Sequence, residues 1–308
     1  MRILITGGAG TLGLQIIEKY KDIADSIHVI DNFATGKRDI FRLYPELNIT
    51  EGSIASEELV KKLFELIEPT HVIHLAASYK DPSNWEEDIT TNISGTAIIT
   101  KLSKQFGVRK LINIQTVLCY GTPDSLPIKI DSALRPRSSY SISKVAGEQY
   151  IINSGVPYAS LRLGNVISPG LAIGPIPNFY KKLKTGETPT VTDSKRDFLD
   201  IADFLSALDK VMNLSSPSGV FNISTGVGTS MMQIYEMVAK YLNSQVIPIK
   251  SKPSEDDVSE VVLDPSESLK ILDWKASVEI GHSINNCLDY YEKFGVGTIY
   301  SHLKRSTN

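Results

Sequence analysis

The sequence has little cysteine, no long apolar run and almost no net charge. Two cysteines, Cys119 and Cys287, are too few for a disulfide framework, so we expect both thiols to be reduced. No window approaches the roughly 20 apolar residues of a membrane span, and the apolar run at the N-terminus is too short for a signal peptide. These absences lead us to expect a cytoplasmic protein.

The nearly balanced charge argues against partners that are bound through a strongly positive protein surface. A net charge of −3 over 308 residues gives no electrostatic reason to expect nucleic acid or an anionic membrane as a partner. Any anionic ligand must therefore be met by a local site. We also expect no metal, because the five histidines have no helical metal-ligand spacing: His28, His71, His74, His282 and His302.

Short β-branched runs alternate with amphipathic stretches in the first half of the chain. The strand-like runs are "RILIT", "IHVID", "NIT", "HVIHL", "KLINIQ" and "YASLRL", and the helical stretches are 11–21, 56–67, 84–106 and 139–153. This order predicts right-handed βαβ crossovers and a parallel sheet with both faces covered.

The rhythm breaks after Arg162 into "GNVISPGLAIGPIP", which is followed by a helical stretch at 177–185 and a mixed region from about 217 to 294. We expect an α/β protein with a Rossmann-like, doubly wound parallel sheet and a smaller, discontinuous C-terminal lobe that binds substrate. The expected Rossmann domain is 1–164 with about 190–216, and the expected lobe is 165–189 with 217–308. The two parts are predicted to share a cleft.

Three glycines follow the first strand and open a helix. Gly7, Gly10 and Gly13 let the backbone approach a pyrophosphate at the free N–H groups of a helix N-terminus. Alone, this pattern also fits a plain structural turn. The second strand then ends at Asp31, whose carboxylate suits the adenosine ribose and repels a 2′-phosphate, so NAD is favoured over NADP. Lys37 and Arg38 either soften that preference or are simply solvated.

Tyr140 and Lys144 stand four apart in a helical segment, so both side chains lie on one face. A free phenol has a pKa near ~10, and a nearby cation lowers it into the range of a proton acceptor. Such a pair also arises by chance as a half-buried tyrosine with an extended lysine.

Further segments extend these motifs over nearly the whole chain: "TGGAGTLG", "VIDNFATGKR", "HVIHLAA", "TNISGT", "YSISK", "RLGNVISPG", "RDFLDIADF" and "LDPSESLKILDWK". In this order they resemble the extended short-chain dehydrogenase/reductases that act on nucleotide sugars, the group of UDP-glucose 4-epimerase. Within that group the chain looks closest to epimerases of bacterial O-antigen clusters. The resemblance implies a UDP-sugar substrate and a homodimer built from the helices at 84–106 and 139–153.

The resemblance also assigns site residues. The implied catalytic residues are Thr116, Tyr140, Lys144 and Asn92, of which Thr116 supplies the hydroxyl beside the substrate and Asn92 completes the proton relay. The implied substrate contacts are Thr116, Tyr140, Asn165 and Arg196. The implied NAD contacts are Gly7, Gly10, Thr11, Leu12, Gly13, Asp31, Asn32, Ser53, Ile54, Leu75, Ala76, Ala77, Lys80, Tyr140 and Lys144.

The residues after Thr116 bear on the reaction. Related 4,6-dehydratases carry Asp-Glu there, whereas this chain has Val117 and Leu118, neither of which can move a proton. A keto-sugar reductase commonly uses NADPH, which Asp31 disfavours. The leading hypothesis is therefore C4 epimerisation through a 4-keto sugar, with a dehydratase, a reductase or a non-enzymatic NAD sensor as alternatives. Cys119 is interpreted as an apolar filler and Tyr120 as a packing residue at the strand end.

Three positions depart from the family pattern. Ser254 stands where relatives have an arginine that clamps the diphosphate, which shifts that role to Arg196, Lys250 or Lys252. Ser53 replaces an acidic residue of the adenine pocket. Val261 lies near a position where side-chain size admits or excludes N-acetylated sugars, and its small size predicts a bulky substituent.

Overall fold

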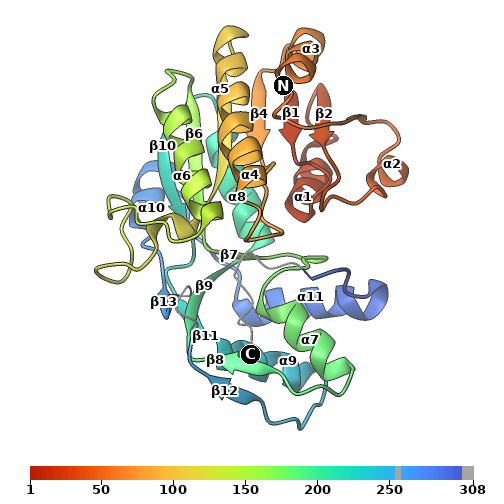
Figure 1. Cartoon of the computed structure of the whole chain (residues 1–308), viewed down its shortest axis with the longest axis vertical. Helices are drawn as coiled ribbons and strands as arrows, with labels where there is room; N and C mark the ends of the chain where they lie inside the picture. Colours follow the sequence, from red (N-terminus) through yellow and green to blue (C-terminus); the bar gives the residue numbers. More distant parts are fainter. Residues whose placement is uncertain (254–257, 300–308) are drawn as a thin grey trace.

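The computed structural model describes residues 1–253 and 258–299, and its main element is a seven-stranded sheet (Figure 1). The strands lie in the order β10, β6, β5, β4, β1, β2, β3, and every neighbouring pair is parallel. Their bounds are β1 (Arg2–Thr6), β2 (Ser26–Asp31), β3 (Asn48–Glu51), β4 (His71–His74), β5 (Lys110–Thr116), β6 (Tyr158–Leu163) and β10 (Gly219–Ile223). The predicted Rossmann-like sheet is thereby confirmed.

Helices connect and cover these strands. They are α1 (Thr11–Tyr20), α2 (Ile40–Leu43), α3 (Glu57–Ile67), α4 (Trp85–Asp88), the π-helix η1 (Ile89–Gly95), α5 (Thr96–Gln105), the 3₁₀-helix η2 (Val117–Tyr120), α6 (Ser139–Ile152), α8 (Ile201–Met212) and α10 (Ser266–Leu272). Side-chain caps fix several of the starts; for example, the Ser56 hydroxyl accepts from Leu59 N–H and Ser138 forms a capping box with Ser141.

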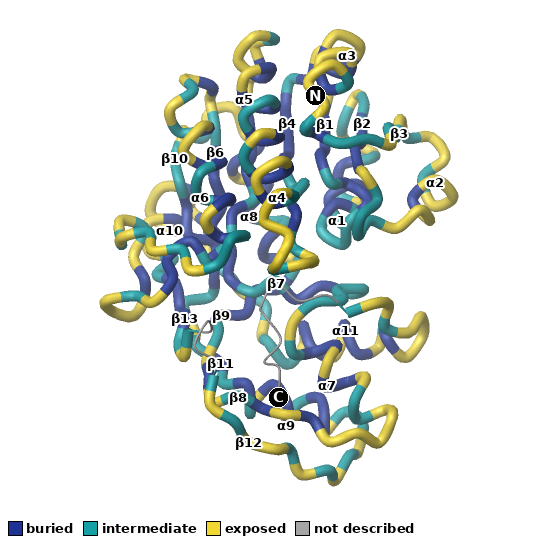
Figure 2. Tube along the Cα trace, viewed as in Figure 1, coloured by how far each residue is buried: buried dark blue, intermediate teal, exposed yellow. Residues whose placement is uncertain are grey.

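Each face of the large sheet has its own apolar core. Strand β1 shows the alternation, since Ile3 and Ile5 pack with α1 and α8 whereas Leu4 packs with α3, α5 and α6. In Figure 2 strands β1, β2 and β4 are buried, while the outward turns of α2 and α3 are exposed. Parallel strands covered on both faces carry near-continuous apolar runs, as this sequence does.

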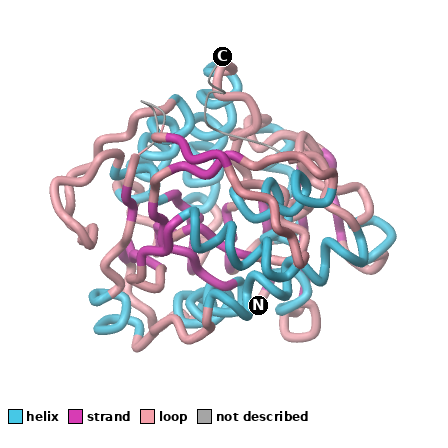
Figure 3. The backbone as a smooth tube through the Cα atoms, turned by 90° about the horizontal axis from the view of Figure 1, so that it is seen from below, coloured by secondary structure: helices cyan, strands magenta, loops and turns pink. Residues whose placement is uncertain are grey.

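The smaller lobe is built on two short sheets. One joins β7 (Asn165–Ile167), β9 (Lys195–Asp200), β11 (Gly228–Ser230) and β13 (Glu260–Val261), and the other pairs β8 (Thr190–Thr192) with β12 (Ile249–Ser251). A third apolar core joins β7, β8 and β9 to α7 (Pro175–Lys184), α9 (Met231–Tyr241) and α11 (Ile280–Phe294). Seen from below, helices and loops surround the strands of both parts (Figure 3).

The predicted segment boundaries need two corrections. Strands β8 and β9 lie in the small sheets although 190–200 was expected in the Rossmann domain. Strand β10, expected in the lobe, lies at the edge of the large sheet, where it pairs with β6 and places Phe221 and Ile223 in the core. Hydrophobic patterning identifies a strand but not the sheet that it joins, because that choice depends on distant contacts.

Candidate active site

One large cavity of about 1340 Å³ lies where the carboxyl ends of the parallel strands meet the smaller lobe. Strand order reverses between β1 and β4, and ligands of open α/β sheets bind outside the strand ends at such a point. The catalytic residues, NAD contacts and substrate contacts that the resemblance assigned all lie on the wall of this cavity except Asn92. The structure therefore brings the glycines, Asp31, the Tyr140 segment, Asn165 and Arg196 to one place.

The glycine segment requires two of its glycines for close backbone approach. Gly7 has φ +69°, and a Cβ there would lie 2.7 Å from the Ala76 nitrogen. A Cβ on Gly13 would lie 2.4 Å from the Gly8 carbonyl oxygen. Helix α1 begins directly after Gly10 with no side-chain cap, and Thr11 and Leu12 of its first turn line the cavity. Such an end suits an anionic pyrophosphate.

Asp31 is 8% exposed and each of its oxygens accepts one backbone N–H, from Ala9 at 2.9 Å and from Phe33 at 2.8 Å. Burial raises the pKa of this carboxyl, and the two backbone hydrogen bonds oppose that rise. A carboxylate oxygen has more than one acceptor site, so both oxygens keep capacity for ribose hydroxyls. Arg38 pairs with Glu51 and does not line the cavity, whereas Lys37 does.

Thr116, Tyr140 and Lys144 come together from two elements. The Ser138–Ser141 capping box starts helix α6 so that Tyr140 stands in its first turn, with Lys144 one turn later. The Lys144 ammonium donates to the Ile114 carbonyl on β5 at 2.8 Å. Thr116 ends the same strand, and its hydroxyl hydrogen-bonds the Tyr140 phenol.

The acidities of this group differ from the sequence expectation. Burial raises the pKa of Tyr140 well above its usual range, nearby Tyr79 and Asp88 add to the rise, and the Thr116 hydroxyl opposes it. Lys144 was expected to lower the pKa of Tyr140, but burial outweighs any such effect. Burial also lowers the pKa of Lys144 to about 8, against the opposing charge of Glu148.

Asn92, which the resemblance assigned to the proton relay, does not border the cavity. It is 1% exposed. Its Oδ1 accepts from Ser78 N–H at 2.8 Å, and its Nδ2 donates to the Ser78 carbonyl and to the Ser143 hydroxyl. The amide instead ties the loop after β4 to helix α6, and it does so from the π-helix η1.

The lysines that were expected to hold the diphosphate also need correction. Lys250 and Lys252 do not line the cavity, whereas Lys181 and Lys182 of helix α7 do, together with Arg196. Two adjacent lysines in the last turn of a helix are an ordinary pattern, so nothing in their spacing marks them as ligand contacts. Val261 is buried in a core with Val117 and Cys119 and does not border the cavity. Ser254 lies outside the described residues.

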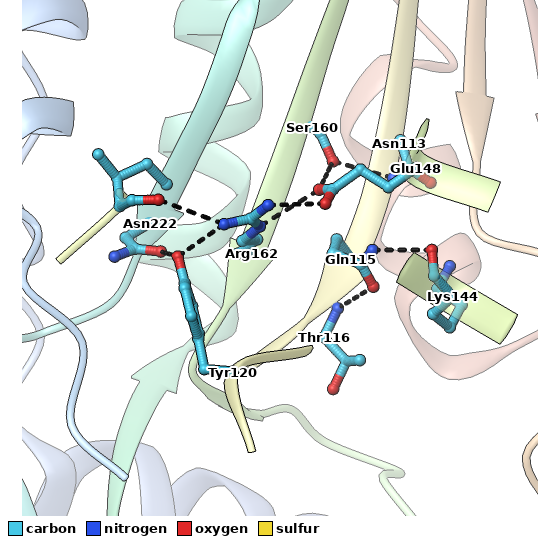
Figure 4. A network of polar contacts seen from close by, with 10 residues as sticks. Asn113, Gln115, Thr116, Tyr120, Lys144, Glu148, Ser160, Arg162 and Asn222 are labelled. Atoms are coloured by element: carbon cyan, nitrogen blue, oxygen red, sulfur yellow. Dashed lines mark hydrogen bonds and ion pairs between the residues drawn. The ribbon is translucent and has the colours of Figure 1, made fainter. Parts of the chain in front are cut away.

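The four residues after Thr116 divide between the cavity wall and the buried interior. Val117 and Leu118 both lie on the cavity wall. Cys119 is buried, and burial raises its pKa to about 12, so it is no thiolate at neutral pH. Tyr120 is also buried, but its hydroxyl donates to Asn222 at 2.8 Å and accepts from Arg162 at 2.9 Å, within a polar network behind the cavity (Figure 4).

Two further features concern ligands and membranes. Within 1–253 and 258–299, no group of three or more His, Cys, Asp or Glu side chains is arranged to hold a metal ion. The helices of the same residues include none that is long and apolar enough to cross a membrane.

Comparison with known proteins gives concordant results. The profile described as the NAD dependent epimerase/dehydratase family matches residues 3–224. The chain is 47% identical to the Bordetella bronchiseptica enzyme WbmG, solved in complex with NAD and UDP, over 99% of this chain and 98% of that one, with a TM-score of 0.93. It is 33% identical to WbmH of the same organism, solved with NAD⁺, over 96% and 99%, with a TM-score of 0.91.

A third similar structure has a named activity. The Thermotoga maritima UDP-glucose 4-epimerase, solved with UDP-glucose, is 28% identical over 95% of this chain and 99% of that one, with a TM-score of 0.87. The family profile covers most of this chain, and the glycine turn and Asp31 fit the adenosine diphosphate end of the cofactor. The chain is therefore an enzyme of the NAD dependent epimerase/dehydratase family, with NAD as its cofactor.

Proposed function

We propose that this protein is an NAD-dependent nucleotide-sugar 4-epimerase that acts on a UDP-linked sugar through a transient 4-keto intermediate. One observation carries the proposal: Thr116, Tyr140 and Lys144 share one wall of the cavity, and the next residues on that wall, Val117 and Leu118, have no group that moves a proton. Oxidation and reduction at one carbon need only the first three groups, whereas elimination of water needs a further acid and base.

Each of the three side chains has a separate task. NAD, when bound, takes and returns the hydride. Tyr140 removes the proton of the C4 hydroxyl and gives it back after the sugar has turned. The Thr116 oxygen accepts Leu118 N–H and its hydroxyl hydrogen-bonds the Tyr140 phenol, which places both hydroxyls together beside the C4 oxygen. Lys144, with a pKa of about 8, is mainly protonated at neutral pH and favours the Tyr140 phenolate by charge.

The size of the cavity supports epimerisation. Its volume of about 1340 Å³ exceeds the roughly 300–1,000 Å³ of ordinary ligand pockets, which leaves room for a dinucleotide and for a sugar that must present both faces. We assign the diphosphate to Arg196, Lys181 and Lys182, because these cations lie on the wall contributed by the smaller lobe. Asn165, at the start of β7, is assigned to the same ligand.

The cellular setting is also a proposal. We infer a role in bacterial surface polysaccharide synthesis in the cytoplasm, which rests on the segment resemblance described above.

A homodimer is supported by the outer faces of α4, η1 and α6, where Trp85, Ile89, Ile142 and Tyr150 are each more than half exposed. Apolar side chains gathered on neighbouring helices are typical of an interface.

The reaction is tested by incubating the purified protein with UDP-glucose, UDP-N-acetylglucosamine and UDP-glucuronic acid, and with each C4 epimer, while NMR follows the sugar protons. We expect one matched pair to reach the same equilibrium from both sides. In heavy water the sugar carbons should stay unlabelled, because the hydride returns internally. A stable 4-keto-6-deoxy product would establish a dehydratase instead, and label at C3 or C5 would establish enolisation.

The roles are tested with Tyr140→Phe. Loss of the phenolic proton acceptor should lower turnover by about 10²–10⁴-fold. Tyr44→Phe is the matched control, because its hydroxyl bonds Glu18 at the surface away from the cavity, and turnover should be unchanged. Full activity of Tyr140→Phe would refute the mechanism.

A further inference from the structure

Three consecutive residues of strand β5 engage helix α6 at the wall of the cavity. The Ile114 carbonyl accepts from the Lys144 ammonium at 2.8 Å. The Gln115 side-chain amide donates to the Lys144 backbone carbonyl at 2.9 Å, and its Oε1 accepts from the Thr116 N–H at 2.8 Å. Figure 4 shows Gln115 between Thr116 on the strand and Lys144 on the helix.

The orientation of the Gln115 amide is determined by its partners. A backbone carbonyl only accepts and a backbone N–H only donates, so turning the amide over would place two acceptors together and two donors together. Gln115 is 2% exposed, and a buried mismatch of that kind costs about 1–3 kcal/mol per group. The side chain therefore holds one geometry, which joins the backbone of Thr116 to that of Lys144.

This bridge fixes two reacting groups relative to each other. The Thr116 backbone sets where its hydroxyl meets Tyr140, and the Lys144 backbone sets where its ammonium meets Ile114. We propose that Gln115 is a positioning residue that keeps strand β5 and helix α6 in the register needed for proton transfer, an inference that rests on the proposed function for its kinetic consequence.

A matched control stands on the same strand. Asn113 lies two residues earlier, so it faces the same side of the sheet, and it is also 2% exposed. Its amide donates to the Ser160 hydroxyl at 2.9 Å, and it lines no part of the cavity. Asn113→Ala removes a buried amide contact of similar kind without touching Thr116 or Lys144.

Two variants test the bridge. Gln115→Met keeps the length and removes both hydrogen bonds, and we expect kcat to fall about ten- to hundredfold with KM nearly unchanged. Gln115→Glu keeps the acceptor for Thr116 N–H, and only its protonated form can donate to the Lys144 carbonyl. Its kcat relative to wild type should therefore rise as the pH is lowered, while that of Gln115→Met should not.

A second readout does not depend on the substrate. Protein labelled with ¹³C-lysine is titrated by NMR, and Lys144 is assigned with Lys144→Arg. In the wild type we expect the Lys144 pKa near 8. In Gln115→Met the loosened junction admits water, so this pKa should rise toward its usual range, and in Asn113→Ala it should stay near 8.

The outcomes separate the two proposals. If the wild type converts none of the UDP-sugars, the proposed function fails and the lysine titration alone decides the role of Gln115. The inference would be overturned by a Gln115→Met variant that folds, keeps the wild-type kcat and keeps the wild-type pKa of Lys144. So would equal losses in Asn113→Ala and Gln115→Met, because they would show general destabilisation. If Gln115→Met does not fold, the pH dependence of Gln115→Glu decides.

Discussion

Asp88 carries a buried charge close to Tyr140. It is 1% exposed, and neither of its carboxylate oxygens has a hydrogen-bond partner among the described residues. Buried carboxylates are normally paired, because the loss of hydration is costly. The charge of Asp88 is one of the causes that raise the pKa of Tyr140.

Asp88→Asn should therefore make Tyr140 more acidic. A neutral amide no longer repels the phenolate, so the Tyr140 pKa falls and the rise of kcat on the acid side of the pH profile moves to lower pH. Glu86→Gln, an exposed neighbour that does not affect Tyr140, is the control. Identical pH profiles for Asp88→Asn and wild type would contradict the link between the two residues.

Asp31 offers a test of cofactor choice. In Asp31→Ser the ribose loses a charged acceptor whose hydrogen bonds are worth roughly 1.5–3 kcal/mol, so NAD should bind more than tenfold more weakly and the preference over NADP should shrink. Calorimetry with both cofactors measures this. Asp39→Asn removes an exposed charge nearby and should leave both affinities unchanged. If Asp31→Ser still preferred NAD over NADP as strongly as the wild type, that preference would have to come from other residues.

The sequence predicted most residues of the cavity wall, but it did not predict the hydrogen bonds that hold those residues in place. Gly7, Asp31 and Tyr140 belong to short motifs whose spacing fixes their place in a βαβ unit. Asn92 was assigned to the relay by motif, and the hydrogen bonds of its side chain to Ser78 and Ser143, fourteen and fifty-one positions away, were not foreseen. Contacts across such separations leave no periodic trace, and the same holds for Gln115.

Helices and strands were predicted closely where the alternation was regular. Residues 84–106 were expected as one helix, but the structure divides them into α4, η1 and α5. A π-helical turn changes the hydrogen-bond spacing by a single residue, which hydrophobic periodicity does not register. The widened turn carries Asn92, whose amide ties the loop after β4 to helix α6.

The outer face of helices α5 and α6 permits a direct test of the dimer. Tyr150 is 54% exposed and borders a shallow groove between these helices. Tyr150→Glu should place an unpaired charge in the interface and shift sedimentation velocity toward the monomer. Leu66→Glu on α3, at 73% exposure in the wild type, should not change the sedimentation. A wild-type protein that sediments as a monomer would refute the proposed dimer.

The two parts of the molecule interleave along the chain. The sequence suggested a division at about residue 217, yet β10 and α10 return to the large sheet after the lobe has begun. Asn222 illustrates why, because its amide donates to the carbonyls of Ile128 and Asp264 and so joins three distant segments at the sheet edge. Sheet membership here is decided by contacts made late in the chain.

That interleaving bears on how the protein is made. The apolar core on the α1 face contains both Ile3 and Trp274, so it cannot close until nearly the whole polypeptide has left the ribosome. Until residues 201–223 have been made, the apolar face of β1 lacks α8 and the edge of β6 lacks β10. Synthesis therefore passes through a period in which the N-terminal half is finished but uncovered, which is when nascent chains of this fold are most exposed to aggregation.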